Sequence, residues 1–365
     1  MFLLHRKSLA GLGFTAVAVA STALFAVPAQ AASAGLAKVV GSSAVQFNAL
    51  MGKSNSLTIT ISGRTVTLND KVAIKAGKGC KAVRRDKTKV KCTTPKKTTK
   101  LSVALGDKTD AVVNATSVYM LADGGTGNDT LTGGSGKDQL QGGTGNDKLY
   151  GKAGNDIFFG ESGNDTIVGS SGNDQIDAGS GNDSVTGDAG IDELLGGSGK
   201  DRLAGGAAND TILGGADIDT IYGDAGVDIL FGDAGNDVIS GGVGGDRIFG
   251  DAGNDKIAGG DGDDLVFGLA GNDQITGGAG DDSLAGEDIN AAGIQVGSNS
   301  ALDRIDGGAN TDFCLVMAAG TTANCESPEP GPARPSATAS AALSATAIQG
   351  ARQAESHLAA ARAAE

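Results

Sequence analysis

Residues 124–285 consist of a nine-residue unit that is repeated eighteen times without interruption. The first two units read GGTGNDTLT and GGSGKDQLQ. Position 6 is Asp in every unit, and position 8 is aliphatic or Phe in every unit. Position 1 is Gly except at Ala178, and position 4 is Gly except at Ala208 and Asp217. Repetition at a fixed period predicts a repeat architecture in which each unit packs mainly against its neighbours.

Each unit divides into a Gly-rich hexapeptide and a triplet with one apolar residue at its centre. Glycines permit positive φ angles and close backbone approach, so the hexapeptide predicts a turn. The triplet suits a short strand whose position 8 points inward while positions 7 and 9 point outward. One such strand cannot bury its apolar residue alone, but two facing strands joined by two turns can. The sequence therefore predicts an all-β fold of stacked 18-residue coils that form two parallel sheets.

This coil places Asp residues that are eighteen apart, such as Asp129 and Asp147, on the same edge of successive coils. Neighbouring strands lie about 4.8 Å apart, so the carboxylates form rows of like charge that need cations between their members. Ca²⁺ takes six to eight oxygen ligands at about 2.3–2.6 Å, which carboxylates and turn carbonyls can supply. Mg²⁺ fits less well because it requires tighter octahedral geometry and retains its waters. The repeats therefore predict bound calcium.

The pattern G-G-x-G-x-D-x-U-x strongly resembles the RTX, or hemolysin-type calcium-binding, repeat family. The resemblance covers 162 of the 365 residues and implies a right-handed parallel β-roll with Ca²⁺ between consecutive turns on each edge. It implies that the position-6 aspartates are the ligands. Each edge has nine of them and therefore eight gaps between neighbours, so the two edges hold at most sixteen sites. The aspartates of one edge are Asp129, Asp147, Asp165, Asp183, Asp201, Asp219, Asp237, Asp255 and Asp273. Those of the other edge are Asp138, Asp156, Asp174, Asp192, Asp210, Asp228, Asp246, Asp264 and Asp282.

Residues 1–31 have the features of a secretory signal peptide. A basic start is followed by the apolar run LAGLGFTAVAVASTALFAV, and Ala29 and Ala31 give the small-residue spacing of a cleavage site after Ala31. A transmembrane anchor is the alternative interpretation of this segment. No later stretch is long and apolar enough to span a bilayer. We therefore expect an extracellular protein secreted by the general route, whereas many RTX proteins use a C-terminal signal and a dedicated one-step system.

The four cysteines are consistent with an oxidising compartment. Cys80 and Cys92 bracket the basic segment KAVRRDKTKVK, whose centre falls at Asp86, as in a β-hairpin closed by a cross-strand disulfide. Cys314 and Cys325 close a second short loop. Two local disulfides are the simplest prediction, although four cysteines allow three pairings. A zinc site is disfavoured because supporting histidines are lacking.

Charge divides the chain outside the signal peptide. Residues 32–123 carry 16 Lys/Arg and 5 Asp/Glu, and their alternating patterns, such as SLTITISG and TVTL, predict a small all-β domain that caps the first coil. Its segment GDKTDAVV, with Asp110 and Val112, resembles a decayed repeat. Residues 124–285 carry 7 Lys/Arg and 29 Asp/Glu.

The sequence beyond the repeats divides into two parts. In residues 286–325, a twelve-residue insertion (286–297) precedes two degenerate repeats with Asp303 and Asp312 at position 6, and the second cysteine pair ends this C-terminal cap. Residues 326–365 predict a flexible linker followed by an Ala-rich tail that is flexible or helical.

The sequence does not favour catalysis. The chain after residue 31 has one histidine, His357, and no H-E-x-x-H motif, so serine or cysteine triads lack a base. We expect a non-enzymatic, calcium-binding structural or adhesive protein of the cell surface or matrix. The alternative is a calcium-dependent, hemolysin-like cytolysin or effector, which would need a membrane-active segment that we do not find. An ice-binding surface would need more regular Thr ladders at positions 7 and 9.

Two further surfaces are hypotheses for partner binding. The basic hairpin KAVRRDKTKVK could contact an anionic polymer such as a cell-wall polyanion or nucleic acid, or it could be a solvated basic face. An apolar stripe also runs along position 9 of alternate units. It is either an exposed surface for adhesion or self-association, or a stabilising cross-strand stack, or a face that the 286–297 insertion or the tail covers. The stripe comprises Leu195, Leu213, Phe231, Phe249 and Phe267.

Overall fold

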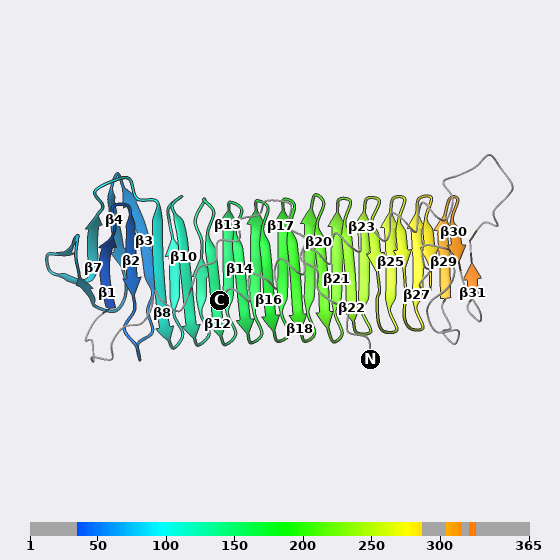
Figure 1. The fold of residues 1–365 in the computed structure, drawn as a ribbon, viewed down its shortest axis with the longest axis horizontal. Helices are drawn as coiled ribbons and strands as arrows, with labels where there is room; N and C mark the ends of the chain where they lie inside the picture. Colours follow the sequence, from blue (N-terminus) through cyan, green and yellow to red (C-terminus); the bar gives the residue numbers. More distant parts are fainter. Residues whose placement is uncertain (1–34, 287–303, 316–320, 324, 326–365) are drawn as a thin grey trace, which may run out of the picture.

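The computed structural model describes residues 35–286, 304–315, 321–323 and 325. In these residues every regular element is a strand, and the strands stack along the long axis of an elongated solenoid (Figure 1). The part of the chain that the structure describes has no helix with the length and apolar character needed to span a bilayer. The predicted signal peptide, most of the 286–297 insertion, and the linker and tail lie outside the described residues.

The strands form two sheets, which we call sheet A and sheet B. Sheet A has fifteen strands in the order β30-β28-β26-β24-β22-β20-β18-β16-β14-β12-β10-β8-β2-β1-β5. From the N-terminal side these are β1 (Gly35–Val40), β2 (Ala44–Asn48), β5 (Ile74–Ala76), β8 (Lys100–Asp107), β10 (Tyr119–Thr126), β12 (Gln139–Thr144), β14 (Ile157–Ser162), β16 (Gln175–Ser180), β18 (Glu193–Ser198), β20 (Thr211–Ala216), β22 (Ile229–Ala234), β24 (Arg247–Phe249), β26 (Leu265–Phe267), β28 (Ser283–Ala285) and β30 (Phe313–Leu315).

Sheet B has sixteen strands in the order β31-β29-β27-β25-β23-β21-β19-β17-β15-β13-β11-β9-β3-β4-β7-β6. These are β3 (Leu57–Ser62), β4 (Thr65–Asn69), β6 (Cys80–Val83), β7 (Asp86–Thr93), β9 (Ala111–Asn114), β11 (Thr130–Thr132), β13 (Lys148–Ala153), β15 (Thr166–Ser171), β17 (Ser184–Ala189), β19 (Arg202–Ala207), β21 (Thr220–Ala225), β23 (Val238–Val243), β25 (Lys256–Asp261), β27 (Gln274–Ala279), β29 (Arg304–Ala309) and β31 (Thr321–Ala323).

Successive strands of each sheet in the repeats are parallel and in register eighteen residues apart. In sheet A, Leu140 of β12 pairs with Phe158 of β14, and in sheet B, Leu149 of β13 pairs with Ile167 of β15. The chain therefore contributes one strand to each sheet per coil, so each coil contains two nonapeptides. This arrangement confirms the predicted parallel β-roll and its 18-residue coil.

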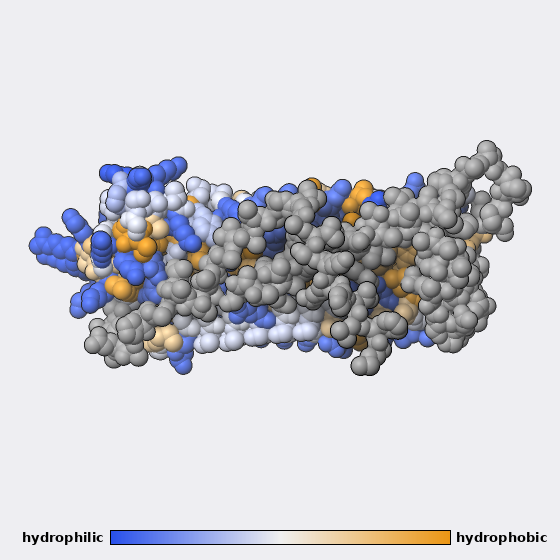
Figure 2. Space-filling model, viewed as in Figure 1, coloured by the Kyte–Doolittle hydropathy of each residue, from blue (hydrophilic) through white to orange (hydrophobic). Residues whose placement is uncertain are grey.

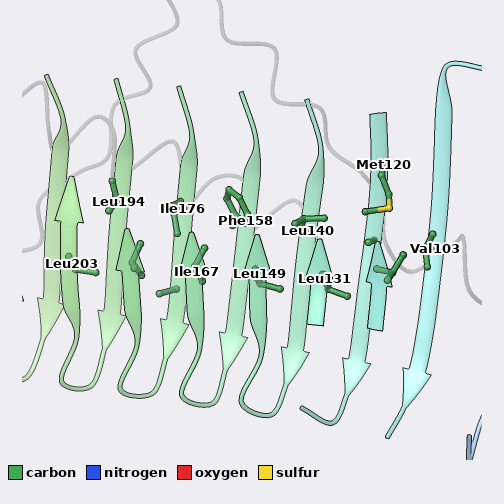
Figure 3. Packing of buried hydrophobic residues seen from close by; sticks show 14 of the residues in the cluster. Val103, Met120, Leu131, Leu140, Leu149, Phe158, Ile167, Ile176, Leu194 and Leu203 are labelled. Atoms are coloured by element: carbon green, nitrogen blue, oxygen red, sulfur yellow. The ribbon is translucent and has the colours of Figure 1, made fainter. Parts of the chain in front are cut away.

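The position-8 side chains of the repeats form the core of the roll. Every one is at most 2 % exposed, and the two sheets contribute alternately. Figure 3 shows these side chains in the space between the two sheets, with Leu131, Phe158 and Leu203 among them. The core is one side chain wide in each strand, as the single apolar residue of each repeat predicts.

The turns require glycine where successive coils come closest. Gly145, at position 4 of its repeat, has φ 128°, and a Cβ there would stand 1.9 Å from the carbonyl oxygen of Gly127 in the preceding coil. Ala208 and Asp217 occupy the same position with φ 85° and 79°, in the left-handed region that costs L-residues about 1–2 kcal/mol. The two departures from glycine at position 4 are therefore points of backbone strain.

The basic N-terminal region continues both sheets. Its strands β1–β9 add to sheets A and B, and β10 crosses the sequence boundary between residues 123 and 124. Antiparallel pairs occur here, β1 with β2 and β3 with β4, whereas the repeat strands pair in parallel. The region has a wider core that contains Phe47, Ile59 and Leu68, each at most 1 % exposed.

Both predicted disulfides are present. Cys80 and Cys92 are directly opposed in the β6–β7 hairpin, with a Cα–Cα distance of 3.9 Å. The turn lies at Arg84–Arg85, directly before the predicted centre at Asp86, because a bulge between Ala82 and Val83 shifts the register. Cys314 in β30 is joined to Cys325, with a Cα–Cα distance of 5.7 Å. No cysteine in the described residues is free.

The apolar stripe of position 9 is present on the outer side of sheet A, and most of it is buried. Phe231, Phe249 and Phe267 stack with ring centroids 4.8 and 5.5 Å apart. They are 4 %, 0 % and 5 % exposed, and Leu213 is 3 % exposed, whereas Leu195 is half-buried. The small accessible area of these phenylalanines favours the alternative of a stabilising stack, and self-association through the stripe stays a prediction.

Candidate metal centre

All eighteen position-6 aspartates lie in two rows, one along each edge of the roll. The row that starts at Asp129 immediately precedes the repeat strands of sheet B, and the row that starts at Asp138 immediately precedes those of sheet A. We call them the Asp129 row and the Asp138 row. Every member is only 0–3 % exposed. The structure therefore brings the predicted ligands together as the 18-residue coil requires, and it buries them.

A hydrogen-bond ladder fixes one oxygen of each carboxylate. Within both rows, the backbone amide of one aspartate donates to Oδ1 of the aspartate eighteen residues later, over N–O distances of 2.6–2.9 Å. The amide of Asp129, for example, donates to Asp147 Oδ1 at 2.7 Å. These hydrogen bonds hold the carboxylate side chains in a single orientation without any bound ligand.

The second oxygen, Oδ2, is buried without a hydrogen-bond partner in sixteen of these aspartates. In the Asp129 row these are Asp129, Asp147, Asp165, Asp183, Asp201, Asp219, Asp237 and Asp255. In the Asp138 row they are Asp156, Asp174, Asp192, Asp210, Asp228, Asp246, Asp264 and Asp282. A buried carboxylate oxygen without a partner is costly, and its recurrence at a fixed register indicates a ligand with positive charge.

Burial raises the pKa of these carboxyl groups. The pKa of Asp165 and that of Asp219 are raised to about 7, and that of Asp174 is raised to about 6. Desolvation is the main cause, the backbone hydrogen bond partly opposes it, and neighbouring carboxylates add to it. The rows therefore disfavour their own charge unless cations compensate it.

The position-1 glycines leave open a cradle that is lined by oxygen atoms from two coils. At Gly223, a Cβ would lie 2.5 Å from Asp228 Oδ2 and 2.5 Å from the carbonyl oxygen of Gly241. At Gly142, the corresponding distances are 2.5 Å to Asp147 Oδ2 and 3.0 Å to the carbonyl oxygen of Gly160. Carboxylate and carbonyl oxygens thus converge on space that only glycine leaves free. This donor set fits Ca²⁺, a hard cation that prefers oxygen ligands.

Carbonyl oxygens are needed to complete each site. Among the described residues, no three acidic, histidine or cysteine side chains converge on one point. A gap in a row has two aspartates, and the six to eight ligands of Ca²⁺ must then include backbone oxygens or water. The aspartate rows can therefore bind divalent cations, which neutralise the charge of the carboxylates.

Ala178 is the one position-1 residue of the repeats with a side chain. It is 0 % exposed, and its methyl group stands where the other repeats keep the cradle open for the aspartate five residues later, here Asp183. Its carbonyl oxygen still faces the preceding coil, because a Cβ at Gly160 would lie 2.2 Å from it. The departure at Ala178 therefore affects the cradle of Asp183 and leaves that of Asp165 lined by a carbonyl oxygen.

Position 5 forms a second ladder on the exposed side of the turns. The amide of Asn164 donates to Asn146 Oδ1 at 2.9 Å, and that of Asn182 donates to Asn164 Oδ1 at 2.9 Å. These bonds run in the opposite direction along the roll from those of the aspartates. They explain the frequent Asn-Asp pair of the repeats, since Asn and Asp each satisfy an amide of an adjacent coil.

Both rows extend beyond the repeats to aspartates outside the eighteen. At the C-terminal end, the amide of Asp282 donates to Asp312 Oδ1 at 3.1 Å across the insertion. At the N-terminal end, the amide of Asp110 donates to Asp129 Oδ1 at 2.7 Å. The sequence signals are the degenerate repeat around Asp312 and the decayed repeat GDKTDAVV around Asp110, and neither aspartate is among the ligands that the nonapeptide pattern predicts.

The comparisons with known proteins agree with this site. The family of RTX calcium-binding nonapeptide repeats (4 copies) matches residues 123–158, 150–185, 159–194, 186–221, 195–230, 222–257 and 258–288. A search of curated proteins found no match to the chain. Residues 123–288, with their aspartate rows, therefore belong to the RTX calcium-binding nonapeptide repeat family.

Proposed function

We propose that this calcium-binding β-roll is a secreted, non-enzymatic protein whose repeats fold when Ca²⁺ binds, and that it has a structural and adhesive role at the cell surface or matrix. The observation that carries the proposal is the pair of buried carboxylate rows with Oδ2 atoms that lack hydrogen-bond partners. Without cations, those rows combine electrostatic repulsion with desolvation. The position-6 aspartates are the ligands in this proposal.

A small core makes this dependence strong. Each nine-residue unit contributes one side chain to the core between the sheets, and only a few units bury a second one on the outer side of sheet A, while ordering a residue costs about 1–2 kcal/mol of backbone entropy. The formal charge of residues 124–285 is −22, from 7 Lys/Arg and 29 Asp/Glu. Calcium ions between the coils neutralise this charge and connect neighbouring strands, so binding free energy becomes folding free energy.

A calcium titration followed by far-ultraviolet circular dichroism tests the folding step. We expect a largely unfolded repeat region in excess chelator and a cooperative gain of β signal as calcium is added, with Mg²⁺ much less effective. Extracellular modules typically have dissociation constants of about 10⁻⁴–10⁻³ M, which sets the range to explore. A complete β spectrum that is unchanged in excess chelator would contradict the proposal.

The adhesive role is assigned to the basic end of the molecule. The β6–β7 hairpin is at the edge of sheet B, at the blue end of the chain in Figure 1. Its Lys81, Arg84, Arg85, Lys87 and Lys91 are exposed. Hydrophilic side chains dominate the tip of this end in Figure 2. A charged surface remote from the acidic repeats suits an anionic polymer of a cell wall or surface.

Charge reversal tests this assignment. We expect Arg84→Glu, Arg85→Glu and Lys87→Glu together to abolish retention on heparin or purified wall polyanion, while the calcium-induced β signal is unchanged. The matched control reverses three exposed lysines of the roll, Lys137, Lys148 and Lys256, and should retain binding. Equal retention of both variants would contradict a role for the hairpin, and calcium-dependent lysis of membrane vesicles would instead favour a cytolysin.

A further inference from the structure

The Asp129 row does not end at the first repeat but continues into the N-terminal region. Ala111 of β9 pairs with Thr130 of β11 in the same parallel register as the repeat strands. Asp110 precedes β9 as Asp129 precedes β11, and its amide makes the 2.7 Å bond to Asp129 Oδ1 that is typical of the row. Its spacing from Asp129 is nineteen residues, so the strict nine-residue period does not include it.

Asn55 takes the next place beyond Asp110. In β3, Leu57 pairs with Val112 of β9, so Asn55 occupies the position of an aspartate in the row. Its backbone amide donates to Asp110 Oδ1, as the amide of each aspartate donates to the next. Its Nδ2 donates to the carbonyl oxygen of Lys53 at 3.1 Å and lies 3.3 Å from Asp110 Oδ1.

Two buried oxygens remain without hydrogen-bond partners at this point. They are Asn55 Oδ1 and Asp110 Oδ2, and the two residues are 1 % and 2 % exposed. The carboxylate of Asp70 is close to the same place, because its Oδ1 accepts the amide of Ser56 at 2.6 Å. Burial raises the pKa of Asp110 to about 6, and the charges of Asp70 and Asp107 add to this effect.

The Asp138 row ends differently at the same end of the roll. Asp138 Oδ1 accepts the amide of Met120 at 2.6 Å, and its Oδ2 accepts the amide of Gly134 at 2.5 Å. Met120 occupies the place of the preceding aspartate and carries no ligand oxygen in its side chain. At the N-terminal end of the Asp138 row, hydrogen bonds thus satisfy both oxygens of the last carboxylate. The Asp129 row instead ends in two buried oxygens without hydrogen-bond partners, which indicates that a ligand binds there.

We infer that Asn55 and Asp110 form a further Ca²⁺ site outside the family-matched repeats, with Asp70 supplying the balancing negative charge. The inference rests on the calcium dependence proposed above and assigns it to residues that the nonapeptide pattern does not cover. Asn55 lies two residues before β3, Asp70 directly follows β4 and Asp110 directly precedes β9. An ion at this site therefore ties the antiparallel strands of the N-terminal region to the first coil of the roll.

Counting bound calcium in the full chain tests the site. Equilibrium dialysis with metal analysis should show about one ion fewer per chain for Asp110→Asn than for the natural sequence, at equal calcium-induced β signal. Asp86→Asn, in the half-exposed hairpin, is the matched control and should bind the natural number. An unchanged ion count in Asp110→Asn would overturn the inference and leave the proposed function intact, whereas failure of the natural protein to bind calcium would overturn the proposed function itself.

The reverse substitution sharpens the test. Asn55→Asp restores the carboxylate that the repeats have at this place, so a bound cation predicts about tenfold tighter calcium binding at the N-terminal end, as ligand charge increases. Without a cation site, the same change adds a buried charge beside Asp110 and lowers the thermal midpoint in saturating calcium. A lower midpoint with no gain in affinity would therefore also overturn the inference.

Discussion

The N-terminal strands and the repeat coils share the same two sheets, but the interactions that stabilise them differ. The N-terminal region has antiparallel pairs, a disulfide and a wide core that includes Phe47, Leu68 and Val90. The repeats bury one apolar side chain per nonapeptide between the sheets, a short outer stack on sheet A, and two rows of carboxylates. Sheet continuity therefore does not mean shared energetics: the N-terminal region has a wide apolar core and a disulfide, whereas the proposed function makes the roll depend on compensation of the buried charge.

The largest predicted effect is a rescue of the calcium-free roll by acid. Folded-state pKa values of about 6–7 exceed the ordinary value of 3.8, so their contribution to stability is fully present below about pH 3.8 and is lost as pH rises through about 6–7. In excess chelator, circular dichroism should show a folded roll near pH 4 and an unfolded one at pH 8. Equal unfolding at both pH values would show that charge is not what prevents folding.

The next largest effect is a difference between the two regions in how core truncation depends on calcium. Phe158→Ala in the roll and Phe47→Ala in the N-terminal region each remove a fully buried ring and should cost about 3–5 kcal/mol. The Phe158 change should lower stability only when calcium is present, because the roll is already unfolded without it. The Phe47 change should act in both conditions. Denaturant titrations with and without calcium measure the loss of stability in each variant. Equal effects of Phe158→Ala in both conditions would contradict the difference in calcium dependence between the two regions.

A smaller effect is expected from the stacked phenylalanines on the outer side of sheet A. Phe249 is fully buried between two rings, so Phe249→Thr should lower stability in calcium by about 2–4 kcal/mol. Tyr222→Thr at the equivalent place on sheet B is the control. Tyr222 is half-buried and contacts Arg202 through a cation–π pair worth about 0.5–1 kcal/mol. Comparable losses of stability in the two variants would show that the outer side of sheet A is not more tightly packed than that of sheet B.

The smallest predicted effect concerns backbone strain in the turns. Ala208→Gly removes a left-handed alanine with φ 85° and should raise stability in calcium by about 1 kcal/mol. Gly145→Ala at the equivalent position should lower it, because the methyl group would meet the carbonyl oxygen of Gly127. Thermal melts in saturating calcium check both changes. A stabilising effect of Gly145→Ala would show that the coils are less tightly stacked than the structure indicates.

The sequence alone predicted the roll because its nine-residue period encodes a local unit that repeats. Positions 6 and 8 assign Asp129 to an edge and Leu131 to the core directly. Features that depend on contacts outside the period could not be read in this way. The bulge at Ala82 that moves the hairpin turn, the burial of Phe249 and the meeting of Asn55 with Asp110 all arise from tertiary packing between segments without a common pattern.

Hydrogen exchange measured by mass spectrometry, with and without calcium, tests the central claim most directly. In calcium, amides of both regions should be protected. In excess chelator at pH 7, peptides from the repeats should exchange fully within seconds, while peptides containing β3, β4 and β7 should remain protected. Protection of the repeat peptides in chelator, or equal loss of protection in both regions, would contradict the account that the roll alone depends on cations for its fold.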